Sequence, residues 1–158
     1  MVFKASLDKL AKGITIGLAV LFIALPIWSL FLIGELHIST IIALIFGFFI
    51  FLITYAYRPV HYVLNPDTII IKRGMSDIVI ERFDVRKVEL IDKQRLSRSM
   101  RVFGVGGVFG YFGKFTNHKI GVMTWYATRR DKAVLFVTKQ QKKYIITPDQ
   151  AQEFVEKA

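Results

Sequence analysis

Cysteine is absent from this chain of 158 residues, which excludes disulfide bonds, thiolate metal sites and cysteine nucleophiles. Histidine is scarce, because His37, His61 and His118 are the three in the sequence, and no two of them have the spacing of a metal-binding pair. The sequence also contains no internal repeat and no low-complexity tract. We therefore expect no catalytic residues, no metal site and no cofactor, and we expect that the protein is not an enzyme.

Charged residues are missing from two long apolar segments near the N-terminus. Residues 13–33 and 38–57 contain no Lys, Arg, Asp or Glu, and a short break separates them. About 20 helical residues cross a hydrocarbon core of about 30 Å, and backbone groups in lipid must bond within the helix. The two segments therefore predict a transmembrane helical hairpin over residues 13–57. The alternative is a pair of buried helices in a soluble protein, but a soluble helix needs a polar face that neither segment has.

Positive charge lies on both sides of this hairpin. Residues 1–12 carry a formal charge of +2, residues 58–158 carry +9, and Glu35 is the one charged residue between the apolar segments. Because cytoplasmic flanks are rich in Lys and Arg, we predict a multi-pass protein of the inner (plasma) membrane with both termini in the cytoplasm. A secretory signal peptide is the alternative for the first segment, but the apolar run is too long and a second one follows at once.

Aromatic and basic residues mark the predicted inner edge of the second segment. Tyr55, Tyr57 and Arg58 fall there, as membrane-interface anchors do. Pro59 follows immediately and ends the helix, so no flexible linker separates the hairpin from the domain predicted over residues 58–158. Trp28 lies inside the first segment and not at its edge, so we expect it to face the second helix.

Short β-rich runs alternate with turn residues after Pro59 and predict an all-β arrangement. The predicted strands are residues 61–64, 68–72, 78–83, 88–91, 121–128, 133–138 and 143–146. The polar, basic residues 93–99 are expected to form a loop. Many short strands with one terminal helix indicate a β-sandwich or a partly open barrel.

The end of the chain carries the signals of a helix N-terminus. Thr147 is a favourable N-cap residue, Pro148 suits the first turn, and Asp149 favours the positive end of the helix dipole. Gln150 stands where a capping box requires it, three residues after Thr147. We expect this helix to cap the β-domain.

A stretch rich in glycine and aromatic residues spans residues 101–115. It does not fit a phosphate-binding loop, since Val108 stands where the first glycine is required and Phe115 where Ser or Thr is required. A dinucleotide fingerprint fails as well, because Phe109 replaces its last glycine. We therefore expect a bend or bulge in a strand, with glycines where backbones approach closely. Its aromatic residues would be core residues or membrane-facing wedges: Phe103, Phe109, Tyr111, Phe112 and Phe115.

Clustered basic residues are the candidate lipid- or partner-binding site. Near an anionic leaflet each Lys or Arg contributes about 1 kcal/mol of attraction. The alternative is an ordinary solvated face, and a nucleic-acid partner is not expected because no nucleic-acid motif accompanies the charge. The candidate residues are Lys93, Arg95, Arg98, Arg101, Arg129, Arg130 and Lys132.

Four segments together resemble the bacterial pleckstrin-homology-like (PH-like) domain family that follows two membrane helices. They are Arg101 to Phe115, Gly121 to Thr128, Val134 to Val137, and Tyr144 to Asp149 with Phe154. The resemblance implies a two-sheet fold of about seven antiparallel strands with a C-terminal capping helix, and it implies no catalytic role. The basic signature that eukaryotic PH domains carry in their first hairpin is replaced here by Asn65, Pro66 and Asp67 at the tip.

These observations favour a membrane-anchored, non-enzymatic module in a scaffolding or sensing role. Its expected partners are the lipid bilayer and either anionic lipid head groups or another membrane protein. Two alternatives stay open: a self-assembling protein whose copies pair through the PH-like domain, and an enzyme of the membrane surface that acts on lipid head groups.

Overall fold

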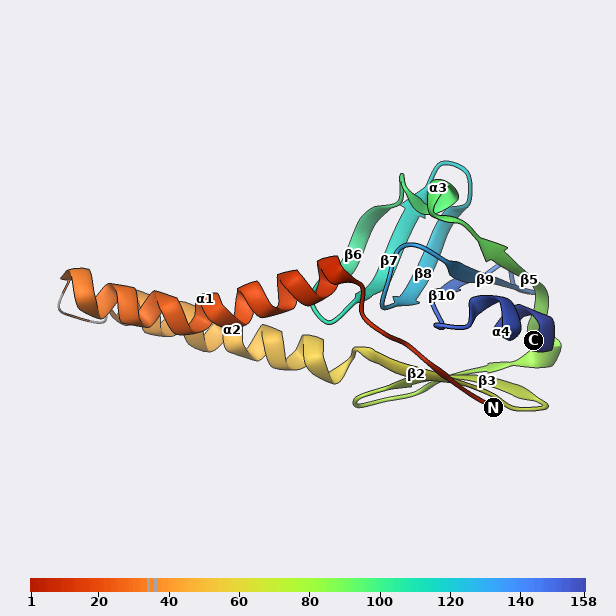
Figure 1. Ribbon diagram of the computed structural model, residues 1–158, viewed down its shortest axis with the longest axis horizontal. Coiled ribbons are helices and arrows are strands. Elements are labelled where there is room, and N and C mark those ends of the chain that lie inside the picture. The colour runs from red at the N-terminus through yellow and green to blue at the C-terminus, as the bar shows by residue number, and fades with distance from the viewer. Residues whose placement is uncertain (34, 36) are drawn as a thin grey trace.

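Two long helices project together from one side of a β-domain (Figure 1). The computed structural model describes residues 1–33, 35 and 37–158. Helix α1 covers Lys9–Ile33 and helix α2 covers Ile38–Ala56. Within the described residues these two helices are long and apolar enough to span a membrane, and 6% of each apolar window is buried. They are therefore not packed as core helices, and we describe them as candidate membrane spans.

Helix α1 begins at Lys9, four residues before the uncharged segment. The Asp8 carboxylate accepts a hydrogen bond of 2.7 Å from the backbone N–H of Ala11, and the Asp8 carbonyl accepts one of 3.0 Å from that of Lys12. Asp8 is thus the N-cap of α1, a role that Asp performs well because its carboxylate satisfies N–H groups that have no partner within the helix.

The strands of the described residues form two sheets. The four-stranded sheet has the order β1-β2-β3-β4 and the six-stranded sheet the order β5-β9-β10-β8-β7-β6. The first sheet comprises β1 (Val2–Lys4), β2 (Pro59–Leu64), β3 (Thr68–Arg73) and β4 (Ile78–Glu81). The second comprises β5 (Val85–Ile91), β6 (Met100–Gly106), β7 (Tyr111–Asn117), β8 (Gly121–Ala127), β9 (Ala133–Thr138) and β10 (Lys143–Ile146). Three short helical elements complete the domain: η1 (Arg82–Asp84), α3 (Lys93–Leu96) and α4 (Ala151–Lys157).

The predicted fold class is confirmed, but the expected number of about seven strands is too low and the expectation that all of them are antiparallel is wrong. Nine strands of the described residues lie after Arg58, and β10 pairs in parallel with β8. The glycine-aromatic stretch accounts for part of the difference: its register does shift between Arg101 and Phe103, as expected for a bulge, but it forms two strands, β6 and β7, that pair as a hairpin. Its glycines do lie where backbones approach closely: a Cβ at Gly104 would be 2.3 Å from the Phe112 carbonyl oxygen.

Two local predictions also differ from the structure. Asp92 accepts a hydrogen bond from the Arg95 N–H and caps the short helix α3 inside the predicted loop. Thr147 is not an N-cap: it is fully buried, its hydroxyl accepts a 2.8 Å hydrogen bond from the Thr128 N–H, and α4 starts four residues later. The Thr147 hydroxyl is engaged by the Thr128 N–H, so it does not cap the N-terminus of α4.

Residues ahead of the helices complete the core of the β-domain. Strand β1 pairs with β2, where Val2 lies opposite Val63, and the Met1 amino group donates to the Leu64 carbonyl at 2.6 Å. Phe3 is 2% exposed and its ring centroid lies 4.8 Å from that of Phe154 in α4. The N-terminus and the β-domain therefore lie on the same side of any membrane that the two helices span.

We expect Phe3→Ala to lower the free energy of unfolding by about 3–5 kcal/mol, because a buried aromatic ring is removed and a cavity is left under α4. Denaturant unfolding of the full-length chain in mild detergent, followed by the fluorescence of buried Trp125, measures this. Val2→Ala is the matched control on the same strand; Val2 is exposed, so the change should stay within about 0.5 kcal/mol. Equal effects of both variants would contradict the placement of β1.

Candidate membrane-interface site

The tip of the β6–β7 hairpin is inserted between the bases of the two helices. The Phe109 ring centroid lies 4.8 Å from that of Phe51 and 5.2 Å from that of Tyr55, both in α2. On the other side, the Phe109 N–H donates a 2.9 Å hydrogen bond to the Thr15 hydroxyl of α1. Because one residue contacts both helices, the β-domain is held against the helix pair at a third point besides the chain connections.

Glycine permits this close approach. Gly107 and Gly110 have φ of 133° and 125°, in the region that favours glycine, and the Gly107 N–H donates to the Gly110 carbonyl at 2.8 Å to close the turn. A Cβ at Gly107 would lie 2.6 Å from Ile14 Cδ1, so a side chain there would require the end of the Ile14 side chain to move. Phe109 itself has φ of 54°, a conformation that non-glycine residues adopt at a cost and that the surrounding contacts offset.

A second contact joins the start of α1 to the strands behind the tip. The Asp8 N–H donates to the Thr128 carbonyl at 3.1 Å, and the Tyr111 hydroxyl donates to the Asp8 carboxylate at 3.2 Å. Ala11 is fully buried in the same core cluster as Tyr111 and Trp125. Burial raises the pKa of Tyr111 to about 12, and the negative charge of Asp8 acts in the same direction. Sequence reasoning missed this role of Asp8, although an Asp just before a helix is a recognisable signal.

The predicted interface anchors lie where α2 joins β2. The Arg58 guanidinium is 3.6 Å from the Tyr55 ring centroid, and the Arg73 guanidinium is 5.4 Å from that of Tyr57. Gly74 packs so closely on the end of α2 that a Cβ there would lie 2.6 Å from the Ala56 carbonyl oxygen. The structure thus adds Arg73 to this group; the level of these residues in a membrane stays a prediction.

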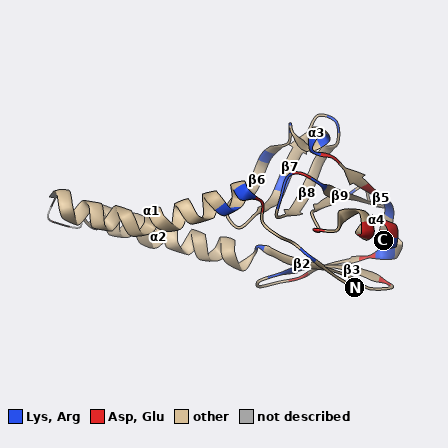
Figure 2. Ribbon diagram, in the orientation of Figure 1, with Lys and Arg blue, Asp and Glu red and all other residues tan. Residues whose placement is uncertain are grey.

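The predicted basic residues are divided among separate pockets, and Figure 2 shows Lys and Arg on several elements of the β-domain. Lys93, Arg95 and Lys132 line a pocket of about 530 Å³ together with Asp92 and Asp131. That pocket therefore contains both signs of charge and has no strong preference for anions.

A second pocket of about 270 Å³ lies on the other side of α3. Arg95 and Arg98 line it with His118 and Lys119. Arg95 also forms an ion pair of 3.2 Å with Glu89, so part of its charge is already compensated.

Arg129 and Arg130 have partners within the domain. Arg129 forms ion pairs with Asp131 at 2.7 Å and with Asp149 at 3.2 Å, and Asp149 in turn accepts hydrogen bonds from Ser6. The Arg130 guanidinium lies 5.0 Å from the Tyr111 ring centroid. Both arginines therefore support the fold, and replacing them would disturb the domain as well as any lipid contact. Arg101 stands apart from the other candidates, on β6 beside the helices.

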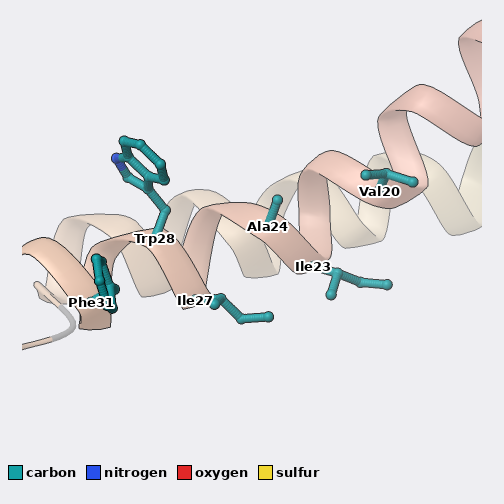
Figure 3. A pocket seen from close by; sticks show the side chains of 6 residues that line it. All are labelled: Val20, Ile23, Ala24, Ile27, Trp28 and Phe31. Carbon is teal, nitrogen blue, oxygen red and sulfur yellow. The ribbon is translucent and has the colours of Figure 1, made fainter.

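Trp28 faces away from α2, so the expectation that it contacts the second helix is wrong. It is 65% exposed and lies in an open hollow on the outer face of α1 (Figure 3). The hollow is lined by residues of α1 alone: Val20, Ile23, Ala24, Ile27, Trp28 and Phe31. The contact between the helices is made on another face of α1, where Phe22 packs on Phe51. This hollow offers no charged group that would select a ligand.

A cysteine pair tests how the hairpin tip is seated. A Cβ at position 107 would lie 3.7 Å from the Ile14 Cβ, within the range of about 3.5–4.5 Å that disulfides require. We expect Ile14→Cys with Gly107→Cys to form an intramolecular disulfide in the full-length chain on mild oxidation, detected by peptide mass spectrometry. The native chain has no cysteine to interfere.

The matched control combines Gly107→Cys and Ile14→Ala with Ile16→Cys, since Ile16 lies on another face of α1 and is exposed. Test and control carry the same backbone strain at position 107 and both lack the Ile14 side chain that would meet the new Cβ, so they differ in the position of the second cysteine. Cross-linking of the control at the same rate would contradict the seating of the tip.

Tyr111→Phe should change how stability depends on pH. The raised pKa of Tyr111 stabilises the folded state fully below about pH 10, and this stabilisation is lost as pH rises from about 10 to 12. The variant lacks the hydrogen bond to Asp8, so at pH 8 its free energy of unfolding should be lower by about 1–3 kcal/mol. Its stability should then fall less steeply than that of the wild type above pH 10. Denaturant unfolding at a series of pH values measures both effects, and parallel pH profiles would contradict the assignment.

Comparison with protein families agrees with this architecture. Residues 60–158 match the family described as Bacterial PH domain, which accounts for more than half of the chain. Comparison with curated proteins gave no match, and comparison with solved structures gave none either. On the strength of the family match, with two candidate membrane spans ahead of it, the chain belongs to the bacterial PH domain family.

Proposed function

We propose that this protein is a non-enzymatic, membrane-anchored module that binds anionic lipid head groups at the inner leaflet. The observation that carries the proposal is the seating of the β6–β7 tip between α1 and α2, because it fixes one face of the β-domain toward the bilayer. The charge difference across the hairpin supports a cytoplasmic location for that face.

Basic residues gather at the bases of the helices. We define the basic collar as Lys9, Lys12, Arg58, Arg73 and Arg101. Lys9 and Lys12 belong to the first turn of α1, Arg58 follows α2, and Arg73 lies beside Tyr57. A Lys or Arg close to an anionic surface contributes about 1 kcal/mol of attraction. Several such residues near the membrane surface therefore favour anionic over zwitterionic lipid.

The rigid attachment changes what the domain can do. A soluble PH domain brings a protein to a membrane, whereas this domain is already anchored there. Contacts that would be too weak for recruitment become effective, since a short tether keeps the collar and the head groups at millimolar effective concentration. The binding would therefore report on the lipid composition next to the anchor, which is a sensing or scaffolding role.

The open edge of β6 supports a second candidate, pairing of two copies through their β-domains. Strand β6 is the last strand of its sheet, and Met100, Val102 and Phe103 on it are exposed. Exposed apolar edge strands pair readily with another strand. Cross-linking in native-like bilayers at increasing dilution tests this candidate, and strictly monomeric behaviour would exclude it.

Lipid selectivity of the full-length chain tests the proposed function. In vesicles that contain spin-labelled phosphatidylglycerol or phosphatidylcholine, electron spin resonance measures the preference of the protein-contacting lipid. We expect Lys12→Gln with Arg58→Gln to reduce the preference for phosphatidylglycerol by about an order of magnitude at low salt, because two collar charges are removed. The preference of the wild type should also weaken as salt is added.

The matched control is Lys139→Gln with Lys142→Gln. These lysines flank the turn between β9 and β10, and Lys139 contacts Phe83 and Asp84 on the part of the domain away from the helices. The control should retain the wild-type preference. An unchanged preference in the collar variant, or an equal loss in the control, would refute the proposed function.

A further inference from the structure

A groove of about 330 Å³ runs along the junction of the helices and the β-domain. Leu18 and Phe22 of α1 line one wall, and Ile50 and Phe51 of α2 line the other. Strand β6 lies across the end of the groove nearest to the β-domain, with Gly104, Val105 and Gly106 in its lining.

Phe22 and Gly47 also line the groove, and there the two helices pack directly on each other. A Cβ at Gly47 would lie 2.7 Å from Phe22 Cε1, so glycine allows the Phe22 ring to lie directly on α2. Thr54 contributes the hydroxyl of the wall, and this hydroxyl donates a 2.7 Å hydrogen bond to the Ile50 carbonyl. The walls therefore present an apolar surface to anything that enters.

Arg101 is the one charged residue among the described residues that line the groove. The Arg101 side chain lies along the backbone at Gly106: a Cβ added to Gly106 would be 3.3 Å from Arg101 Nη1. No carboxylate belongs to the lining, so the positive charge at this end is not compensated within the groove. An apolar channel with a guanidinium at one end matches the amphipathic form of a phospholipid, since arginine binds phosphate with paired, charge-assisted hydrogen bonds.

We propose that this groove binds one anionic phospholipid, with an acyl chain between α1 and α2 and the phosphate on Arg101. The inference rests on the proposed function and goes beyond it, because the collar attracts many lipids loosely whereas the groove holds a single molecule. The lipid arrives from the bilayer, as the groove opens beside the exposed apolar faces of both candidate spans. The bound lipid contacts both helices and β6 at once, and it therefore stabilises the seating of the hairpin tip.

Native mass spectrometry of the full-length chain tests this site. The chain is reconstituted with an equal mixture of phosphatidylglycerol and phosphatidylcholine and then released from detergent micelles. We expect one phosphatidylglycerol to stay bound to the wild type. Arg101→Gln should lower its retention about tenfold, because a charge-assisted phosphate contact is lost. Arg98→Gln is the charge-matched control and should retain the lipid, because Arg98 lines a different pocket beside α3.

A second pair of variants tests the apolar part of the groove. Val105→Trp fills the groove, leaves the charge of Arg101 unchanged and should displace the lipid. Val102 lies on the same strand but does not line the groove, so Val102→Trp should retain the lipid. Retention of the lipid in Val105→Trp, retention in Arg101→Gln, or no retained lipid in the wild type would each overturn the inference.

The two tests fail independently. If the wild type retains no lipid in the gas phase but shows a collar-dependent preference in vesicles, the groove is refuted and the proposed function stands. If a lipid is retained through Arg101 while the collar variant keeps its preference, the collar function is refuted and a discrete lipid site remains.

Discussion

The contact of Phe109 with both helices is the constraint on which the arrangement of this protein depends. Without it, the β-domain would be attached to the helices only near their ends, through Asp8 and Ala11 at the start of α1 and through Pro59 and the packing of Gly74 on Ala56 at the end of α2. With the ring held by Phe51 and Tyr55 and the backbone by Thr15, the β-domain and the helix pair form one body. Gly107 and Gly110 on either side make this possible, because both adopt the positive φ that favours glycine and the tip then packs directly on Ile14 of α1.

The residues ahead of α1 hold the β-domain and the helices together at a further point. Phe3 completes the core under α4, and Val2 pairs with Val63. Residues that precede the two helices in the sequence and residues that follow them therefore share one sheet. The first strand cannot pair until β2 has emerged, and both must then lie on the same side of the bilayer. The domain can therefore complete its core only when the two helices have adopted the hairpin topology. The residues ahead of α1 are therefore part of the β-domain, and wherever the two candidate spans cross a bilayer their insertion is coupled to its folding.

Features that depend on local chemistry could be predicted from the sequence, whereas features that depend on tertiary contacts could not. The uncharged segments predicted both helices, and the β-rich runs with the glycine-aromatic pattern predicted the fold class. Thr147 has the residue type and the spacing of an N-cap, yet its hydroxyl accepts a hydrogen bond from the Thr128 N–H, which lies 19 residues earlier in the chain. Arg129 was assigned to a binding surface, but its charge is paired with Asp131 and Asp149. No sequence pattern distinguishes a free arginine from a paired one.

The same reasoning explains why the collar, and not the larger set of basic clusters, carries the proposed function. A net charge of +10 raises attraction to any anionic surface, but only residues held near that surface contribute strongly, since attraction falls off within a Debye length of about 10 Å. The orientation fixed by Phe109 selects which residues these are. Arg101 illustrates the point: in sequence it belongs with Arg95 and Arg98, yet the β6–β7 hairpin carries it to the helices while the other two remain at α3. In the proposed function, the distance of each Lys or Arg from the bilayer therefore decides how strongly it attracts anionic lipid, which the amino-acid composition alone does not reveal.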